Sequence, residues 1–343
     1  MSGSRSPHPA TALVVAGLLG CGAIPAREPR DEAAPTAQPY VLVLGTAQDG
    51  GLPQIGCNTG NCAAARADPT HRRLVTSLLL CDPRDGRRWL FDCTPDLAEQ
   101  VERARGHPAT RREVGPRPPL FDGLFLTHAH MGHYGGLLQL GREAYAAQEL
   151  STWGTPRFVE FLGHNGPWRS MVEERRLVLH ELAEGKRVEL APDLSVVPFR
   201  VPHRDEFSDT LGFEIRGPHR TLAYLPDIDK WERWDALASS AAGPELTAQR
   251  RIEELIARCD VALLDGSFFA DGEIPGRNMQ DIPHPFLTES IERFAALPEA
   301  ERAKVFFTHL NHTNPAAQAG SEAWCKVRAA GMQVLADGRV FDL

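Results

Sequence analysis

The stretch Thr127–Gly136, THAHMGHYGG, places three histidines within six residues and ends on two glycines. It follows the apolar run at residues 122–126, which is predicted to be a strand, so the histidines begin the loop at the carboxyl end of that strand. Alternate residues of an extended segment project to the same side, so His128 and His130 can chelate one ion together. His133, at the start of the helix expected next, would face a second ion. The stretch therefore predicts a metal centre at the end of a strand.

Further polar residues that can complete this centre stand where other strand-like runs end. Three later runs lead into His203, Asp227 and His309, and another leads into Asp265, which we expect to border the pocket. Rigid strands can aim side chains from separate loops at one point. Neutral imidazoles mixed with carboxylate suit Zn²⁺, Fe²⁺ or Mn²⁺, and an open coordination position makes such a site catalytic. We expect one or two divalent transition metal ions, held by His128, His130, His133, His203, Asp227 and His309.

The remaining pattern alternates strand-like and helix-like segments twice, which predicts a layered α/β protein with sheets in the middle. Apolar spacing predicts a helix at residues 135–147, with Leu137, Leu140 and Ala144 on its buried face. Further helices are predicted at residues 229–237, 251–260 and 289–297. Strands are predicted within residues 40–51, 76–82, 88–93, 122–130, 194–203, 210–217, 220–227, 261–269 and 303–312.

The order of these residues resembles the metallo-β-lactamase superfamily, whose first motif is His-x-His-x-Asp-His. Here the motif reads HAHMGH, with Gly132 in the place of the acid, and VPHRDEFSDTLGFEI, LAYLPDID and VFFTHLNH match the later motifs. The resemblance implies an αββα sandwich, in which two central mixed sheets are flanked by helices. It also implies a first metal on His128, His130 and His203, and a second metal on His133, His309 and the missing acid. Asp227 would bridge the two metals.

Within that superfamily the chain resembles the family of pyrroloquinoline quinone (PQQ) biosynthesis protein B, from about Val41 to the C-terminus. The segments VLGTAQDGGLPQIGCNTGNC and FFTHLNHTNP carry this likeness. The family has a structural zinc on a cluster of three cysteines, of which the middle one is Thr59 here, and His312 replaces an asparagine. Two interpretations of Cys57 and Cys62 follow. They are zinc ligands together with His71 or another partner, or they form a disulfide.

The resemblance and the residues favour a metal-dependent hydrolase, in which a metal-activated water attacks a small-molecule ester or lactone, amide or phosphodiester. Asp227 or a group of the substrate would orient that water, since Gly132 has no acid, and His312 would act as the general acid or cap the last helix. Two histidines with one carboxylate are also typical of non-haem Fe(II) oxygenases, so an iron-dependent hydroxylase of the PQQ-biosynthesis type is the alternative. A non-catalytic carrier of a small cofactor in the periplasm is a third possibility.

Three further residues lie near the predicted centre in the chain or on similar loops. Asp92 ends a strand and resembles an acid that supports a metal-bound histidine. Asp49, in QDGG, either borders the pocket or only forms a turn. His284, in a proline-rich loop close to Met279, is expected on a surface loop, with a cover over the site as the alternative.

The first residues differ in composition from the rest. Arg5 precedes an apolar run that stops at LLGC, residues 18–21, which is typical of a bacterial lipoprotein signal. We expect residues 1–21 to be a signal peptide with Cys21 as the lipid-anchored residue, 22–39 to be a flexible linker, and 40–343 to be the metallo-β-lactamase-fold domain. The protein would then be exported, as a periplasmic or cell-envelope lipoprotein whose compartment permits disulfides.

The overall charge argues against one class of partner. The net charge of the 343-residue chain is −8, and no run of lysine and arginine stands out. A basic surface for phosphate backbones is therefore not indicated, and we expect no nucleic-acid partner. The predicted partners are a small-molecule substrate and, through the lipid on Cys21 alone, a membrane. The oligomeric state is left open.

Overall fold

The structure is a computed structural model that describes residues 38–58, 60–106, 119–241 and 251–343. The predicted signal peptide, most of the linker and Thr59 lie outside the described residues. Within the described residues, no helix is both long enough and apolar enough to cross a membrane.

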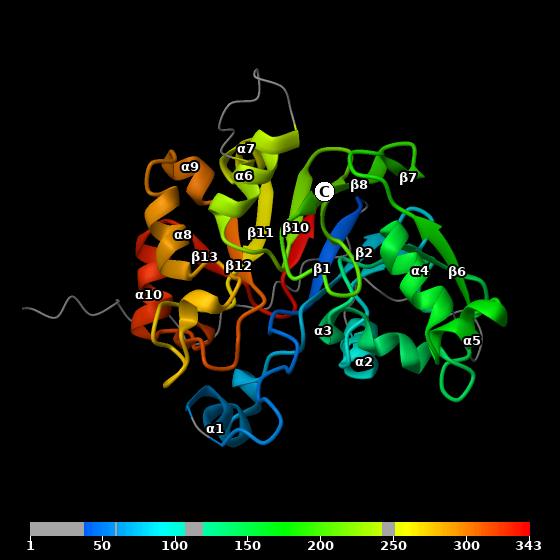
Figure 1. Ribbon diagram of the computed structural model, residues 1–343, viewed down its shortest axis with the longest axis horizontal. Coiled ribbons are helices and arrows are strands. Elements are labelled where there is room, and N and C mark those ends of the chain that lie inside the picture. Colours follow the sequence, from blue (N-terminus) through cyan, green and yellow to red (C-terminus); the bar gives the residue numbers. More distant parts are fainter. Residues whose placement is uncertain (1–37, 59, 107–118, 242–250) are drawn as a thin grey trace, which may run out of the picture.

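Two seven-stranded sheets form the middle of the molecule (Figure 1). The first has the order β14-β1-β2-β3-β4-β5-β6 and the second the order β13-β12-β11-β10-β9-β8-β7, each with parallel and antiparallel pairs. The first sheet comprises β1 Tyr40–Gly45, β2 Ser77–Asp82, β3 Arg87–Phe91, β4 Gly123–Phe125, β5 Leu150–Gly154, β6 Leu177–Glu181 and β14 Val340–Asp342. The second comprises β7 Val188–Ala191, β8 Leu194–Val201, β9 Thr210–Arg216, β10 Thr221–Leu225, β11 Val261–Asp265, β12 Val305–Thr308 and β13 Gln333–Val334.

Helices cover the outer face of each sheet, as Figure 1 shows. The α-helices are α1 Gly60–Ala67, α2 Leu97–Gly106, α3 Met131–Tyr134, α4 Pro156–His164, α5 Trp168–Glu173, α6 Trp231–Ala241, α7 Arg251–Arg258, α8 Leu287–Phe294, α9 Glu299–Arg302 and α10 Glu322–Ala329. Helices α2, α4 and α5 pack on the first sheet, and α6, α7, α8 and α10 pack on the second. The predicted αββα sandwich is confirmed.

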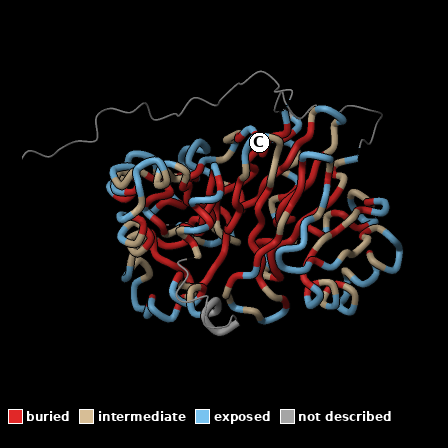
Figure 2. The backbone as a smooth tube through the Cα atoms, turned by 90° about the horizontal axis from the view of Figure 1, so that it is seen from above, coloured by how far each residue is buried: buried red, intermediate tan, exposed pale blue. Residues whose placement is uncertain are grey.

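The core consists of three apolar layers, because each sheet is covered on both faces. Between the sheets, the Phe213 ring lies 5.5 Å from that of Phe91 and 5.8 Å from that of Phe125, centroid to centroid. Central strands such as β1 and β11 are buried along their whole length, which explains their continuous apolar sequences. Figure 2 shows this buried middle between exposed outer loops. A frame packed on both sides holds the strand ends rigidly.

The helix predicted at residues 135–147 is wrong in its type and length. Gly135–Leu140 forms a 3₁₀ helix, and Ala144 is exposed after it, while Leu137 and Leu140 are buried as expected. A spacing of three residues repeats on one face of a 3₁₀ helix, so the pattern fits both helix types. Gly136 also touches the backbone, since a Cβ there would lie 2.1 Å from the carbonyl oxygen of Thr94. The start of this segment therefore packs directly against the chain after β3.

Candidate metal centre

The predicted ligands come from the ends of strands in both sheets. His128 and His130 follow β4 of the first sheet, whereas His203, Asp227 and His309 follow β8, β10 and β12 of the second. Strand β10 is parallel to β11, which is parallel to β12, and β8 and β10 are both antiparallel to β9, so β8, β10 and β12 end at the same edge. The strand β4 ends at Phe125, earlier than predicted, so the histidine stretch starts in an irregular loop. The topology thereby brings residues from distant parts of the chain to one place.

The first ligand set consists of His128, His130, His203 and Asp227, whose ligand atoms all lie within 4.8 Å of one another. His130 Nδ1 lies 2.9 Å from His128 Nε2 and 3.2 Å from His203 Nε2. Asp227 Oδ2 lies 3.3 Å from His128 Nε2 and 3.2 Å from His203 Nε2. Ligand atoms bound tetrahedrally at about 2.1 Å lie about 3.4 Å apart. The first set therefore has the spacing of a divalent metal site.

The second ligand set shares the same oxygen of Asp227. Its Oδ2 lies 3.7 Å from His133 Nε2 and 3.9 Å from His309 Nε2. Asp49, from the loop after β1, places its Oδ1 3.5 Å from His133 Nε2 and 3.8 Å from His309 Nε2. The structure thus brings all six predicted ligands together around Asp227, and Asp49 lies with them instead of only forming a turn.

The atoms that face the second position have no hydrogen-bond partner although they are buried. These atoms are Asp49 Oδ1, His133 Nε2 and His309 Nε2. A buried polar atom without a partner costs about 1–3 kcal/mol, so three together need an explanation. A divalent cation would satisfy the oxygen and both nitrogens at once, because each can offer a lone pair. The donor set therefore fits a bound metal ion.

Asp92 occupies the supporting position that was predicted for it. Its Oδ2 lies 2.9 Å from His133 Nδ1 and accepts a hydrogen bond of 3.0 Å from the Tyr224 hydroxyl. Its Oδ1 accepts bonds of 2.9 Å from both the backbone N–H and the hydroxyl of Thr127. These contacts fix the ring of His133 so that Nε2 faces Asp227, as carboxylates behind metal-bound histidines do.

His284 belongs to the centre, so the prediction of a surface loop is wrong. It is 3% exposed, and its Nδ1 lies 2.8 Å from Asp265 Oδ2 and 3.2 Å from Asp227 Oδ1. Asp265 accepts further bonds from the backbone N–H groups of Ser267 and Ile228, so its oxygens are already in use. Buried apolar side chains anchor the loop, namely Phe268, Met279, Ile282 and Phe286. The apolar residues on both sides of His284 were the one sequence signal for its burial.

Glu206 is a further residue that the sequence did not reveal. Its Oε2 lies 2.8 Å from Nε2 of His130, on the side of the ring away from Asp227. Two residues later, the Ser208 hydroxyl accepts a 2.8 Å bond from the Ala129 N–H. The loop after β8 therefore holds the histidine loop in place at two points, and Glu206 orients His130.

The charges at the centre favour added positive charge. Burial alone would lower the pKa of His133, but Asp92 and Asp49 raise it to about 9. Burial would also lower the pKa of His284, but the carboxylates of Asp265 and Asp227 raise it to about 9. Burial would raise the pKa of Asp227, yet the histidines around it, His203 first, hold it well below its ordinary value. The site thus binds extra protons when no cation is present, which is the behaviour expected of a cation site.

The cysteine segment forms a further group of residues that could hold a metal ion, and of the two interpretations of Cys57 and Cys62 the disulfide is not found. Cys57 and Cys62 are not joined by a disulfide, and their sulfurs lie within 4.8 Å of each other and of a ring nitrogen of His312. The distance from Cys62 Sγ to His312 Nδ1 is 3.4 Å. His71 is exposed and pairs with Asp68 instead, at 3.8 Å. The structure thus favours the zinc-ligand interpretation with His312, not His71, as the partner.

This placement does not support a catalytic role for His312. In the described part of the chain, its ring is grouped with the cysteines and is not among the atoms gathered around Asp227. It caps no helix either, since Ser321 caps α10 and Asn314 caps the 3₁₀ helix Pro315–Ala317. Apart from the predicted ligands, the buried histidine beside Asp227 in the described residues is His284.

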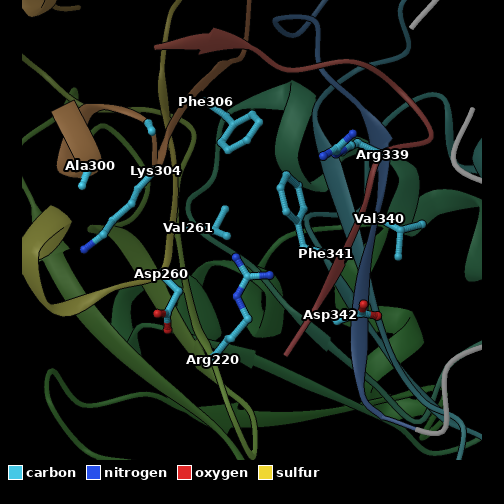
Figure 3. A pocket seen from close by; sticks show the side chains of 11 residues that line it. Arg220, Asp260, Val261, Ala300, Lys304, Phe306, Arg339, Val340, Phe341 and Asp342 are labelled. Atoms are coloured by element: carbon cyan, nitrogen blue, oxygen red, sulfur yellow. The ribbon is translucent and has the colours of Figure 1, made fainter. Parts of the chain in front are cut away.

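A cavity of about 400 Å³ lies at the opposite edge of the second sheet. Figure 3 shows its lining, which includes Arg220, Val261 and Lys304. These residues stand at the amino ends of β10, β11 and β12, whereas the metal ligands follow their carboxyl ends. This cavity is therefore separate from the candidate metal centre.

The sequence of the chain matches a family model and is similar to known proteins. Residues 87–310 match the family model described as the beta-lactamase superfamily domain. The chain is 28% identical over 326 residues to coenzyme PQQ synthesis protein B of Methylorubrum extorquens, in an alignment that covers 89% of this chain and 100% of that protein. The protein of the same name from Xanthomonas campestris pv. campestris is 27% identical over 320 residues, covering 87% and 98%.

Two solved structures show the same fold. Zn²⁺-bound PqqB from Methylobacterium extorquens has a TM-score of 0.70 at 24% identity, covering 89% of this chain and 100% of that one. A diphosphatase from the PhnP family has a TM-score of 0.57 at 20% identity, covering 89% and 97%.

Proposed function

Because the chain belongs to the metallo-β-lactamase superfamily, we propose that it is a metal-dependent hydrolase of a small molecule. The single observation that supports this most is the position of Asp227, whose Oδ2 lies within 3.9 Å of a ring nitrogen from each of four histidines. One carboxylate oxygen between two pairs of imidazoles is the arrangement of a two-metal hydrolytic centre. The substrate classes proposed are an ester or lactone, an amide and a phosphodiester.

The residues of the chain have separate tasks in this proposal. Divalent metal ions would polarise the carbonyl or phosphoryl oxygen and lower the pKa of a bound water. Asp227 and Asp49 would supply carboxylate oxygens to these ions, and Asp92 holds His133 in one orientation. His284, oriented by Asp265, is the group proposed to give a proton to the leaving atom. It replaces His312 in that role.

The deciding experiment is a screen for hydrolysis with the protein loaded with Zn²⁺ or Mn²⁺. The probes are p-nitrophenyl esters, a homoserine lactone, a β-lactam and bis(p-nitrophenyl) phosphate. We expect turnover of at least one class, lost by more than about 1,000-fold in His128→Ala, since a metal ion supplies several kcal/mol of the stabilisation. Turnover that survives in His128→Ala would show a contaminating enzyme and contradict the proposal.

The role of His284 is tested on leaving groups. His284→Gln should slow hydrolysis of a substrate with a poor leaving group, such as an alkyl ester, by about 100-fold. It should leave the p-nitrophenyl substrate, whose leaving group needs no proton, nearly unchanged. Equal losses on both substrates would mean that His284 only holds the loop.

An iron-dependent hydroxylase is the second candidate, and the similarity to the PQQ synthesis proteins over most of the chain favours it. It differs from the hydrolase in needing Fe²⁺ and in consuming O₂. Oxygen uptake by the Fe²⁺-loaded protein, measured with PQQ-like quinone precursors, separates the two. Tight binding of such a compound with neither reaction would support the carrier hypothesis instead.

We also propose that the protein is exported and held at the membrane by a lipid on Cys21. The sequence LLGC supports this proposal. When cells are fed labelled palmitate and then fractionated, the wild type should carry the label and sediment with membranes. The Cys21→Ser variant should carry no label. Label in Cys21→Ser equal to that in the wild type would contradict the anchor.

A further inference from the structure

We infer that Asp49 supplies the carboxylate of the second ligand set, the ligand that the histidine motif lacks at Gly132. The inference rests on the proposed function, in that it requires the centre to hold two metal ions. The missing acid of the motif then does not mean a weakened second site. The carboxylate is supplied instead by Asp49, in the loop after β1.

The position of Asp49 supports this directly. Its Oδ1 is buried without a hydrogen-bond partner and faces His133 Nε2 at 3.5 Å and His309 Nε2 at 3.8 Å, neither of which has a partner. These three atoms all lie within 4.8 Å of one another, and Asp227 Oδ2 lies 3.7 Å and 3.9 Å from the two nitrogens. Two imidazoles and two carboxylates are a common donor set for a hydrolytic transition metal.

Gly132 explains why the motif has no acid of its own. A Cβ at this position would lie 2.0 Å from Asp49 Oδ1 and 2.7 Å from Asp49 Cα. The backbone of Gly132 is not in the left-handed region, so glycine is needed there for space and not for conformation. The carboxylate of Asp49 thus occupies the volume where the side chain of the usual acid would begin. The two positions exclude each other, and only one acid can serve the site.

Backbone hydrogen bonds hold Asp49 beside His309. The N–H of Gln48 donates to the carbonyl of Leu310, and the N–H of Leu310 donates to the carbonyl of Thr46, both at 2.9 Å. A third bond of 2.8 Å, from Gly51 N–H to the Gln48 carbonyl, closes the turn around Asp49. Since Leu310 follows His309 directly, the loop after β1 and the end of β12 form one unit. The carboxylate is therefore placed by the same backbone that places the histidine.

Counting Mn²⁺ tests the inference, because thiolates bind this hard cation poorly and the cysteine group will not add to the count. Free Mn²⁺ is followed by electron paramagnetic resonance while the metal-free full chain is titrated. We expect two ions for each wild-type chain and one for Asp49→Ala, with Asp49→Asn, which keeps the shape, weakening the second ion by about 10- to 100-fold. Asp68→Ala, which changes an exposed acid in the same part of the chain, is the control and should bind two.

Gly132→Ala gives an independent test, since it removes no ligand atom. The added methyl group would displace Asp49, so this variant should also bind one ion. Gly163→Ala in α4, where a Cβ meets nothing within 4 Å, is its matched control. Circular dichroism verifies that each variant is folded.

Two results would overturn the inference: a wild type that binds a single ion, or an Asp49→Ala variant that still binds two while His133→Ala binds one. Hydrolysis plays no part in this count. A protein that binds two ions through Asp49 and hydrolyses nothing would refute the proposed function and leave this inference standing.

Discussion

The two ligand sets that meet at Asp227 are built in different ways. In the first set, His130 Nδ1 and Asp227 Oδ2 lie 2.9–3.3 Å from the Nε2 atoms of the other two histidines, and two of the three histidines come from one loop. In the second set the corresponding distances are 3.5–3.9 Å, and His133 in α3, His309 after β12 and Asp49 after β1 come from three separate segments. A compact set of neutral imidazoles and a wider set with a second carboxylate should bind their ions with different strength. We expect the first ion to be held tightly and the second to exchange.

Removing the negative charge of the residue that both sets share should have the largest effect. Asp227→Asn is expected to lose both ions and to reduce hydrolysis by more than about 1,000-fold, because no other carboxylate oxygen among the described residues reaches all four histidines. Metal analysis after gel filtration gives the count. The control is Asp260→Asn, which changes an exposed acid at the opposite edge of the same sheet. Retention of one ion would show that Asp227 belongs to one set alone.

The pH dependence of binding should separate the sets by about 100-fold. His133 has a pKa raised to about 9, so below that pH a cation at the second set must displace a proton, and its apparent affinity should rise about tenfold for each pH unit from 7 to 9. Burial lowers the pKa of His128 and of His130, so these two ligands have no proton to displace at pH 7, and the affinity of the first set should change little over the same range. Titration calorimetry in two buffers measures the protons released. Equal slopes for both ions would contradict the assignment.

A smaller effect, confined to the first set, is expected from Glu206→Ala. Loss of the carboxylate that orients His130 should weaken the first ion by about tenfold, at the low end for such supporting partners because Glu206 is exposed. The second ion should be unchanged. Competition with a chelator of known affinity measures the affinities of the two ions separately. A change in the affinity of the second ion alone would contradict the assignment of Glu206 to the first set.

Changing the cysteine group should leave both sets as they are. With Co²⁺, the wild type should show the near-ultraviolet absorption of thiolate bound to cobalt, and Cys62→Ser should lose it because one of the two sulfurs is gone. Mn²⁺ binding and hydrolysis should stay within about twofold of the wild type, since the two groups share no ligand. Loss of an ion from the centre in Cys62→Ser would mean that the groups are coupled.

Much of the site could be predicted because its residues stand in short, recognisable contexts. The strands β1, β8, β9, β10, β11 and β12 have apolar runs that end in turn residues or histidines, and such runs predict the strand ends that the candidate ligands follow. Short or mixed strands such as β5, β7 and β13 were missed, since they have no clear alternation and exist through their neighbours in the sheet. His284 was placed wrongly because a proline-rich loop is usually exposed, whereas this one is anchored by its own apolar residues.

The sequence by itself determined the superfamily, the layered fold and the six histidine and aspartate positions of the motifs, because local patterns of apolar and ligand residues are enough to specify them. It also showed that the motif lacks its acid at Gly132, but not what that loss means. Only the tertiary structure decided that Asp49, 83 positions earlier, fills the same volume, and that His312 lies with the cysteines and His284 with the metal ligands. Contacts between distant loops depend on how strands from two sheets end at a common edge, and no local pattern records that geometry.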